Sequence, residues 1–488
     1  MPYSSAAPIA ERQPSRLSQA LQERLDTLAR AHRVPGAHLA VDTGAGVISA
    51  HTGIADAAAG TPFTADTAVP LGSVTKVYTA AAVMLLADDG DLDPDDAVAS
   101  FVPELRALPE VTIRHLLSHT AGLPAGPDSD TADGASAARY LAGVCTAQDA
   151  LFAPGTGFSY SNAGYVAAGR LIESVTGMTW TEAIQALLLE PLGTAPAFLG
   201  GRATARARAA GHALNTATGQ LRPAQQNLAA VEAPAGALLA SALDLAALGR
   251  ALIGRDPVLP PAAAARMRSP EQGAAPGTLA DAWGLGLALF EQDGRWWCGH
   301  DGNAQGTSCH LRAEPHSGVV VAFTGNAGGA TALWQDLADD LTRFTGVRVP
   351  TAPAPAHRGE PIALPECAGV YHNGRMEYRI TLDADGSPLL SVDGDLPLPL
   401  VCYPDLTCDL VDPTTPADAS RAGASTGTPP PVPSSAYRSR DAPPAAPAPP
   451  DHPSATAAPP RTPSPCPERP ASSAPRAPAP SPLRRTPP

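Results

Sequence analysis

The chain has 488 residues, which exceeds the usual size of one domain, so we expect two or three domains with at least one large core. Its formal net charge of −14 argues against nucleic acid and anionic membrane surfaces as its main partners. No window of the sequence approaches the roughly 18 uninterrupted apolar residues that a transmembrane helix needs, so we also expect no membrane partner.

The N-terminal sequence and the cysteines predict the compartment. Residues 1–15 lack the basic and apolar regions of a secretion signal, and we expect them to be flexible. The seven cysteines are scattered, odd in number and without C-x-x-C pairs, which favours reduced thiols over a disulfide framework. The sequence therefore predicts a cytoplasmic protein.

Residues 16–349 alternate helical and strand patterns and form the predicted main domain. Apolar residues at helical spacing predict a first helix with one apolar stripe, made by Leu17, Leu21, Leu25 and Leu28. Further helices are predicted from Ser73 to near Gly90, after Asn162, and over ATALWQDLADDLTRFTG. The segments WWCGHDG, GTSCHLRA and SGVVVAFTGNA are typical of short strands separated by glycine turns. Strands on both sides of a mostly helical middle predict an α+β fold whose first and last strands meet in one antiparallel sheet.

Three further segments follow the main domain. Residues 350–360 are predicted to be a linker, and residues 361–411 to be an all-β segment in which apolar and polar residues alternate before the turn sequence DADG. Within residues 412–488, 24 prolines occur and no apolar positions recur periodically. This tail, rich in proline, alanine, serine and arginine, is predicted to be disordered because it cannot bury enough apolar surface.

Ser73 and Lys76 form an S-x-x-K pattern, and Lys76 is the only lysine among the 33 lysine and arginine residues. At this spacing both side chains lie on one face of a helix. A free serine is a poor nucleophile that needs an adjacent base, and a lysine can give up its proton whereas an arginine cannot. The pattern predicts a serine nucleophile activated by Lys76, with the backbone N–H of Ser73 available to an oxyanion. The same four-residue pattern also occurs by chance in many proteins.

Tyr160 and Asn162 form a second candidate pair, in the segment GFSYSNAGY. A tyrosine beside a cationic lysine can become a phenolate general base, because the positive charge lowers the pKa of the phenol. Asn162 is predicted to orient the lysine or to hold a substrate carbonyl. The plain alternative is a turn followed by an asparagine-capped helix.

His300, Asp301 and Gly302 form a third candidate motif, at the edge of a predicted strand that lines a cleft. Gly302 permits close backbone approach, and the backbone N–H of Asn303 is predicted to be the second oxyanion donor. A similar H-S-G triplet at residues 316–318 is interpreted as a hairpin turn.

Two histidines and one glutamate carry weaker patterns. His115 and His119 have the spacing of a metal pair, but HLLSH lacks the glutamate of H-E-x-x-H, so we predict structural roles and no metal site. Glu232, just before APAG, is a candidate for substrate contact, although a charge on a surface loop is the favoured interpretation. No motif indicates a cofactor.

In the order S-x-x-K, Y-x-N and H-x-G, these motifs resemble the serine β-lactamase and penicillin-binding-protein superfamily, in its class C β-lactamase-like branch. The segments VPGAHLAV, VTIRHLLSHTAGL, LFAPGTGFSYSNAGY and APAGALLASALDLAALGRALI are similar to recurring segments of that branch, in the same order. The branch includes esterases, D-aminopeptidases and DD-peptidases. The resemblance therefore implies a β-lactamase/transpeptidase-like fold and acyl transfer.

The resemblance also implies a role for each motif. Ser73 attacks a carbonyl, Lys76 and Tyr160 pass the proton, and the backbone N–H groups of Ser73 and Asn303 hold the oxyanion. Water or an amine then releases the acyl group.

The third motif departs from the superfamily in a way that bears on the substrate. β-Lactamases and DD-peptidases usually have lysine at the position of His300, where its charge helps to bind a carboxylate. A mostly neutral His300 beside Asp301 disfavours such anions. We expect an ester, thioester or amide that lacks this carboxylate, or a substrate ammonium that meets Asp301.

The chain also resembles penicillin-binding-protein-type thioesterases, stand-alone enzymes that offload and cyclise nonribosomal peptides, often ones with a C-terminal D-residue. These enzymes carry a small lipocalin-like β-domain, and PECAGVYHNGRMEYRITL resembles its start. Only residues 361–411 precede the tail, about half of what an eight-stranded barrel needs, so we interpret the β-domain as partial. A reading-frame change is one hypothesis for the origin of the tail.

Three interpretations of the function stay open. The first is a cytoplasmic esterase, D-aminopeptidase, β-lactamase or DD-carboxypeptidase. The second is a peptide-cyclising thioesterase that meets a small-molecule or peptidyl substrate as a thioester or on a carrier protein. The third is a binding relative that has lost catalysis, against which the intact Ser73, Lys76 and Tyr160 argue.

Overall fold

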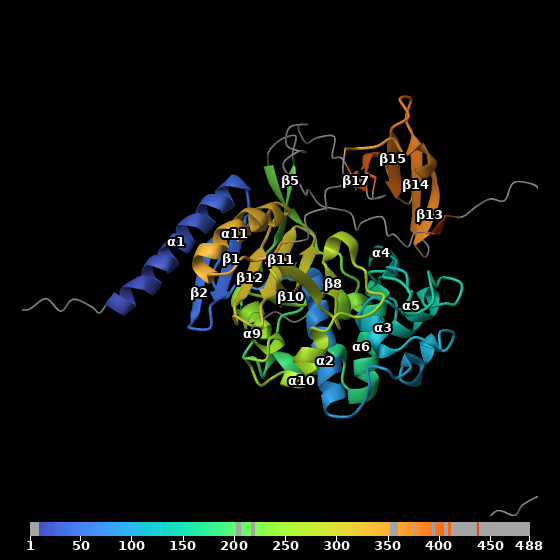
Figure 1. Ribbon diagram of the computed structural model, residues 1–488, viewed down its shortest axis with the longest axis horizontal. Coiled ribbons are helices and arrows are strands. Elements are labelled where there is room, and N and C mark those ends of the chain that lie inside the picture. Colours follow the sequence, from blue (N-terminus) through green and yellow to red (C-terminus); the bar gives the residue numbers. More distant parts are fainter. Residues whose placement is uncertain are drawn as a thin grey trace, which may run out of the picture. The chain divides into compact units, whose positions relative to one another are not determined.

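The computed structural model describes residues 9–127, 129–201, 206–215, 220–351, 360–373, 376–392, 394, 396–404, 408–410 and 437–438. Within them, an eight-stranded antiparallel sheet organises the main domain (Figure 1). Its strands, in spatial order, are β3 (Thr61–Pro62), β2 (Val47–Asp56), β1 (Gly36–Asp42), β12 (Val320–Gly325), β11 (Thr307–Ala313), β10 (Arg295–Ala304), β9 (Ala288–Gln292) and β8 (Ala282–Trp283). Leu39 of β1 lies opposite Phe323 of β12. This pairing confirms the predicted α+β fold, in which the first and last strands meet.

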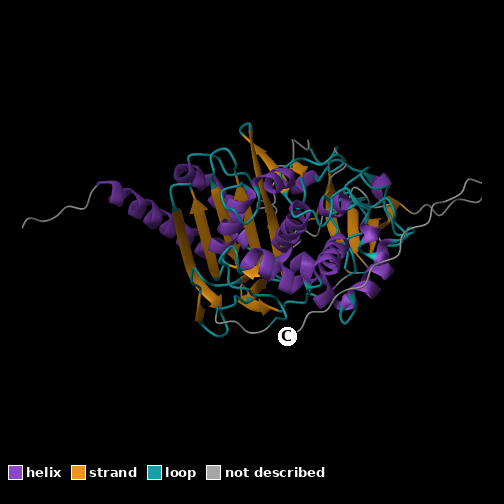
Figure 2. Cartoon of the chain, turned by 90° about the horizontal axis from the view of Figure 1, so that it is seen from below, coloured by secondary structure: helices purple, strands orange, loops and turns teal. Residues whose placement is uncertain are grey.

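Helices cover both faces of this sheet (Figures 1 and 2). α1 (Ile9–Ala31) and α11 (Ala330–Thr345) share one core with Leu39 and Val41, whereas α9 (Ala242–Leu252) shares the other core with Ala40. Neighbouring residues of a strand point to opposite faces, so β1 contributes to both cores. Because β1 and β12 are covered on both sides, every residue in them is buried and neither strand alternates in burial.

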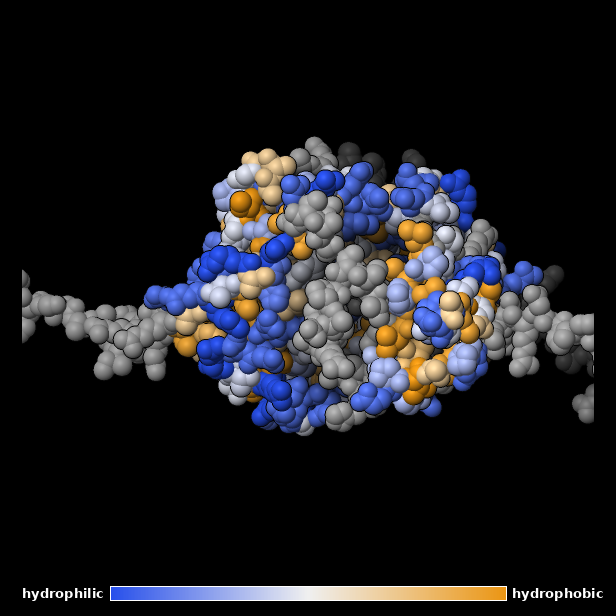
Figure 3. Space-filling model, turned by 90° about the horizontal axis from the view of Figure 1, so that it is seen from above, coloured by the Kyte–Doolittle hydropathy of each residue, from blue (hydrophilic) through white to orange (hydrophobic). Residues whose placement is uncertain are grey.

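The first helix agrees with the predicted stripe but starts earlier. Leu21, Leu25 and Leu28 are buried, whereas Leu17 is partly exposed. The helix begins at Ile9, so the prediction of a flexible segment over residues 1–15 is corrected for residues 9–15. Figure 3 shows one face of the molecule, whose left half is mainly hydrophilic with a few smaller hydrophobic patches.

A largely helical region follows the first strands and carries the candidate nucleophile. α2 (Thr75–Asp88) is buried on nearly every side, and α6 (Asn162–Thr176) packs beside it, so both predicted helices are confirmed. The other α-helices of this part are α3 (Ile113–Leu117), α4 (Ser129–Ala132), α5 (Ala137–Val144), α7 (Trp180–Ile184), α8 (Ala233–Gly236) and α10 (Pro261–Met267). It also contains two short antiparallel strand pairs, β4 (Val69–Pro70) with β7 (Leu239–Ala240) and β5 (Gly211–Asn215) with β6 (Gln220–Ala224).

The C-terminal segment is all-β, as predicted. In spatial order its strands are β17 (Cys408–Leu410), β16 (Leu398–Cys402), β15 (Pro388–Val392), β14 (Met376–Leu382), β13 (Gly369–Asn373) and β18 (Tyr437–Arg438). Tyr378 and Ile380 are buried and Arg379 is exposed, which confirms the alternation in β14. Strand β18 lies within the tail predicted to be disordered, so that prediction is corrected for residues 437–438; the rest of the tail lies outside the described residues.

Among the described residues, no helix combines the length and the apolar character needed to cross a membrane.

The packing of α9 on the sheet gives a first prediction. A Cβ atom on Gly249 would lie 2.4 Å from Val320 Cγ1, so Gly249→Ala is expected to overpack the core and lower the free energy of unfolding by about 1–3 kcal/mol. Gly143→Ala, in open space on α5, is the matched control and is expected to stabilise by up to about 1 kcal/mol through helix propensity. Urea denaturation of both variants checks this; equal stabilities would contradict it.

Candidate active site

Ser73 and Lys76 lie at the start of α2, one helical turn apart. Ser73 is in a 3₁₀ turn (Gly72–Val74) that leads directly into α2. The Lys76 Nζ donates to Ser73 Oγ at 3.0 Å and to the carbonyl oxygen of Ala235, in α8, at 2.9 Å. The S-x-x-K spacing therefore places the two side chains in direct contact, and the α8 carbonyl fixes where the amine lies.

The Lys76 amine is almost completely buried, with 1% of the residue exposed. Burial lowers the pKa of Lys76 to about 7, although the negative charge of Glu232 partly opposes this shift. Removing the amine from water disfavours its charged form. Near neutral pH a substantial fraction of Lys76 is therefore an uncharged amine, able to accept the Ser73 proton.

Tyr160 lies just before α6, and its ring is close to the amine. The Lys76 Nζ is 5.0 Å from the centroid of the Tyr160 ring. Burial raises the pKa of Tyr160 above its ordinary value, although a hydrogen bond with Ser73 acts in the opposite direction. The prediction that Lys76 turns Tyr160 into a phenolate base is therefore corrected. In the free enzyme Tyr160 keeps its proton, and Lys76 is the better base.

His300 of β10 connects to Tyr160 on its other side. His300 Nδ1 lies 2.5 Å from the carbonyl oxygen of Asp301, so Nδ1 carries the proton and donates it there. His300 Nε2 is then an acceptor, 3.5 Å from the Tyr160 hydroxyl. Burial and, next, the charge of Lys76 lower the pKa of His300 to about 4. His300 is therefore neutral at pH 7, as the sequence predicted.

Asp301 is on the other side of β10 and forms an ion pair. Its Oδ1 lies 2.7 Å from both His310 Nδ1 and Arg312 Nη1, and its Oδ2 lies 2.9 Å from Arg312 Nη2. Burial alone would raise the pKa of Asp301, but the positive charge of Arg312 outweighs it and holds the pKa well below its usual range. Because the carboxylate is already paired, the expectation that Asp301 meets a substrate ammonium is corrected. Asp301 anchors the strand that carries His300.

Two glycines let β10 approach the nucleophile. A Cβ on Gly302 would lie 2.1 Å from the carbonyl oxygen of Leu71, and a Cβ on Gly72, whose φ is +52°, would lie 2.1 Å from that of Asn303. The close backbone approach predicted at Gly302 is therefore present. It brings the backbone of Asn303 next to Ser73, where the second oxyanion donor was predicted.

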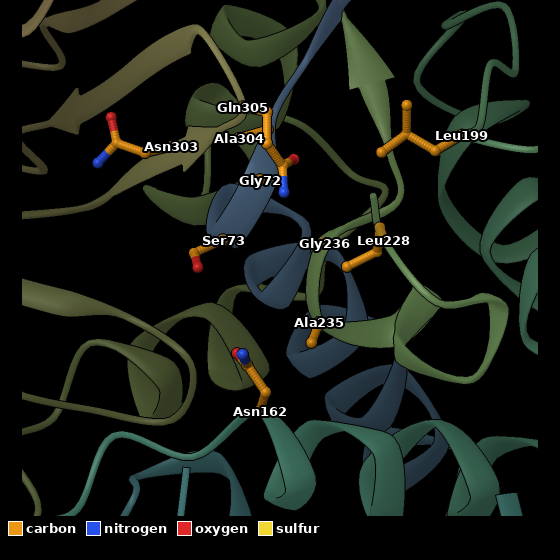
Figure 4. Close-up of a pocket in the computed structure, with 10 residues that line it drawn as sticks. All are labelled: Gly72, Ser73, Asn162, Leu199, Leu228, Ala235, Gly236, Asn303, Ala304 and Gln305. Atoms are coloured by element: carbon orange, nitrogen blue, oxygen red, sulfur yellow. The ribbon is translucent and has the colours of Figure 1, made fainter. Parts of the chain in front are cut away.

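A pocket of about 370 Å³ opens beside Ser73 (Figure 4). Asn162 projects into it from the start of α6, whereas the Asn303 side chain points away from Ser73 and leaves its backbone toward the pocket. The lining residues are Gly72, Ser73, Asn162, Leu199, Leu228, Ala235, Gly236, Asn303, Ala304 and Gln305. None of these ten side chains carries a charge at neutral pH.

Glu232 does not contact this pocket, and it is not on the surface. Only 2% of the residue is exposed. Its carboxylate accepts hydrogen bonds from the hydroxyls of Ser129 and, at 3.4 Å, Tyr140. The interpretation of Glu232 as a surface loop charge is therefore wrong. Its burial depends on a long-range contact with α4 and α5 that no local pattern indicates.

Leu199, Leu228 and Gln305 line the pocket without having been predicted. Each comes from a loop or turn whose position is set by tertiary packing, so the sequence holds no periodic signal for it. The Ala235 carbonyl carries a partial signal, because it lies in the APAG segment already singled out.

Within the described part of the chain, no group of three or more His, Cys, Asp or Glu side chains is arranged to hold a metal ion. His115 instead caps helix α3: its Nδ1 lies 3.1 Å from the backbone nitrogen of Thr112. His119 is buried beside Tyr160.

Comparison with known proteins connects this geometry to a family. The profile of the family described as Beta-lactamase matches residues 17–342. Penicillin-binding protein 4 of Amycolatopsis lactamdurans is 35% identical over 366 residues, which cover 72% of this chain and 96% of that protein.

Solved structures show the same likeness in three dimensions. The protein in a structure of SurE with D-Leu is 35% identical to this chain. The match covers 83% of this chain and 93% of the SurE chain, with a TM-score of 0.70. A D-stereospecific amidohydrolase from Streptomyces sp. is 25% identical, covers 69% of this chain and 99% of that one, and has a TM-score of 0.55.

The pKa of Lys76 gives a second prediction. Only the neutral amine accepts the Ser73 proton, so the kcat/KM for an aryl ester is expected to rise as the pH passes upward through about 7. Lys76→Arg keeps the charge but loses the proton transfer, and we expect a loss of about 10²–10⁴-fold, the usual contribution of a general base. A pH–rate profile without an inflection near neutrality would contradict this assignment.

The ion pair beneath His300 gives a third prediction. Arg312 is completely buried, so Arg312→Met leaves Asp301 without its main partner. We expect this substitution to lower the free energy of unfolding by about 2–3 kcal/mol. The loss is smaller than that expected on breaking a fully buried ion pair, because the Asp301 side chain is partly exposed. The matched control is Arg343→Met, which breaks an exposed pair with Asp340 and should cost no more than about 0.5 kcal/mol. Similar losses in the two variants would show that the pair does not anchor β10.

Proposed function

Because the chain belongs to the β-lactamase family, we propose that it forms an acyl-enzyme on Ser73 from a peptide-derived ester, thioester or amide whose acyl residue has the D configuration. The observation that carries the proposal is the 3.0 Å hydrogen bond between Lys76 Nζ and Ser73 Oγ, made by an amine whose pKa burial lowers to about 7. A nucleophile in contact with a base of this pKa is suited to acyl transfer at neutral pH.

In the acylation step, neutral Lys76 takes the Ser73 proton as Oγ attacks the substrate carbonyl. The backbone N–H groups of Ser73 and Asn303 stabilise the oxyanion, and the Tyr160 hydroxyl gives its proton to the leaving group. Tyr160 then regains a proton from the Lys76 ammonium. Its raised pKa suits this role as a relay, because the hydroxyl does not lose its proton between turnovers.

The charges around the site argue for the substrate class. His300 is neutral, Asp301 is paired with Arg312, and the ten lining side chains are uncharged. No fixed cation among these residues attracts a carboxylate near the scissile bond. The site therefore favours a substrate that is neutral there over a penicillin-like anion.

The D configuration rests on the similar proteins. One is a structure of SurE with D-Leu, and another is named a D-stereospecific amidohydrolase. The apolar wall formed by Leu199 and Leu228 suits an aliphatic side chain. We extend the proposal to offloading of a peptidyl thioester, in which the N-terminal amine of the same peptide attacks the acyl-enzyme carbonyl, Ser73 regains its proton and a cyclic peptide is released.

A fourth prediction tests this proposal. Purified enzyme receives two peptidyl thioesters that differ only in the D or L configuration of the acyl residue, together with an aryl ester and a chromogenic cephalosporin. We expect a kcat/KM about tenfold or more higher for the D substrate, and the slowest turnover for the cephalosporin. Mass spectrometry separates the cyclic product from the linear acid, which is heavier by one water.

The controls separate the parts of the proposal. Ser73→Ala is expected to lower kcat by at least about 10⁴-fold on every substrate. Full activity of this variant would remove the site assignment. Preference for the L substrate would overturn the D-residue claim alone, ready cephalosporin turnover would overturn the charge argument, and exclusive release of linear acid would leave a hydrolase in place of a cyclase.

A further inference from the structure

His119 contacts the residues on both sides of Tyr160. Its carbonyl oxygen accepts a hydrogen bond from the backbone N–H of Ser159 at 2.9 Å, and its Nδ1 accepts one from the backbone N–H of Ser161 at 3.1 Å. The His119 ring lies against the Tyr160 ring, with 4.2 Å between centroids and 33° between planes. One residue thus holds the backbone before Tyr160, the backbone after it and one face of its ring.

His119 occupies this place at an energetic cost. Its φ is +61°, in the left-handed region that residues other than glycine seldom adopt. The two other non-glycine residues with positive φ in the described chain, Arg33 and Asp293, are exposed, whereas only 2% of His119 is exposed. Its Nε2 has no hydrogen-bond partner among the described residues. Strained backbone and an unsatisfied buried group persist where the surrounding structure requires them, and they cluster at functional sites.

The protonation state of His119 follows from its partners. Because Nδ1 accepts from a backbone N–H, the ring proton is on Nε2. Burial first, and then the neighbouring Lys76 and His300, hold the pKa of His119 well below its usual value. His119 therefore stays neutral and adds no charge beside Lys76.

His115 shows what a purely structural histidine does in the same segment. It caps α3 through Thr112, at the opposite end of the HLLSH segment from His119. The hydrogen bonds of its side chain stabilise a helix start, and none of those found among the described residues involves Tyr160. The two histidines of the apparent metal pair thus have different surroundings, and only His119 is next to the reacting groups.

We propose that His119 is a positioning residue for acyl transfer at Ser73, which fixes the backbone and ring of Tyr160 so that its hydroxyl stays between Ser73 and His300. This inference rests on the proposed function of the site. The Tyr160 hydroxyl must serve Ser73 on one side and His300 Nε2, 3.5 Å away, on the other. A displacement of about 1 Å at such a group can cost about 10²-fold in rate.

Two substitutions separate the acceptor from the backbone conformation. His119→Gly accepts the positive φ but removes both the Nδ1 acceptor and the ring. His119→Asn also tolerates this φ, and its side-chain oxygen offers an acceptor near the place of Nδ1. If the acceptor positions Tyr160, Asn retains activity and Gly does not.

The fifth prediction is measured with an aryl ester and with a fluorophosphonate probe that labels Ser73. We expect His119→Gly to lower kcat by about 10²-fold with KM within about threefold, and His119→Asn to stay within about fivefold of the wild type. The decisive readout is a double-mutant cycle with Tyr160→Phe. If His119 acts through Tyr160, adding His119→Gly to Tyr160→Phe lowers kcat no further.

The outcomes distinguish this inference from the proposed function. Labelling of Ser73→Ala at the wild-type rate would remove the proposed function itself. With that control intact, additive effects in the cycle, or wild-type kcat in His119→Gly, would overturn the role of His119. His115→Asn is the matched control and should lower the melting temperature while keeping kcat. If His119→Gly does not fold, His119→Phe, which fills the space without an acceptor, takes its place in the cycle.

Discussion

The burial of one amine is the constraint on which the site depends. A lysine in water keeps its proton at neutral pH and cannot accept another from a serine. Buried at the start of α2, the amine of Lys76 loses its hydration and donates to Ser73 Oγ and the Ala235 carbonyl. These two acceptors suit both protonation states, because the amine can donate to them whether or not it is charged. Glu232, buried nearby, keeps the pKa from falling further. Burial of α2 on nearly every side keeps water away from this amine.

The other elements bring partners to that amine. Strand β10 approaches Ser73 only because Gly302 and Gly72 carry no side chain, and on its other face Asp301 is fixed by Arg312 and His310. Arg312 is in turn held by the carbonyl of Pro350, just after the last helix of the main domain. The position of the oxyanion site is thus tied to the end of that domain, far from Ser73 in sequence. The antiparallel pairing of β1 with β12 brings these distant segments together in one sheet.

The sequence predicted the order of the elements and the motif residues well, because helical periodicity and S-x-x-K spacing are local signals. The sequence also allowed one prediction that was not made. Adjacent residues of a strand face opposite sides, so if His300 lines the site, Asp301 cannot line it. The burial of Glu232 and the pocket contacts of Leu199 and Leu228 had no such signal, since each depends on loops brought together by tertiary packing. The protonation of Tyr160 was mispredicted because burial raises the pKa of its phenol, and a sequence motif does not indicate burial.

The contrast between Lys76 and Arg312 explains why a chain rich in arginine retains one lysine. Arg312 neutralises Asp301 beneath β10, where a cation that never loses its proton compensates the charge of the carboxylate at every relevant pH. The position of Lys76 requires a group that can lose its proton. An arginine there would always donate to Ser73 Oγ and could never accept the proton of the serine. Arginine also could not be neutralised by burial at this depth, so it would remain charged among apolar side chains. In the mechanism that we propose, the fixed charge of Arg312 holds the strand and the titratable amine of Lys76 moves the proton.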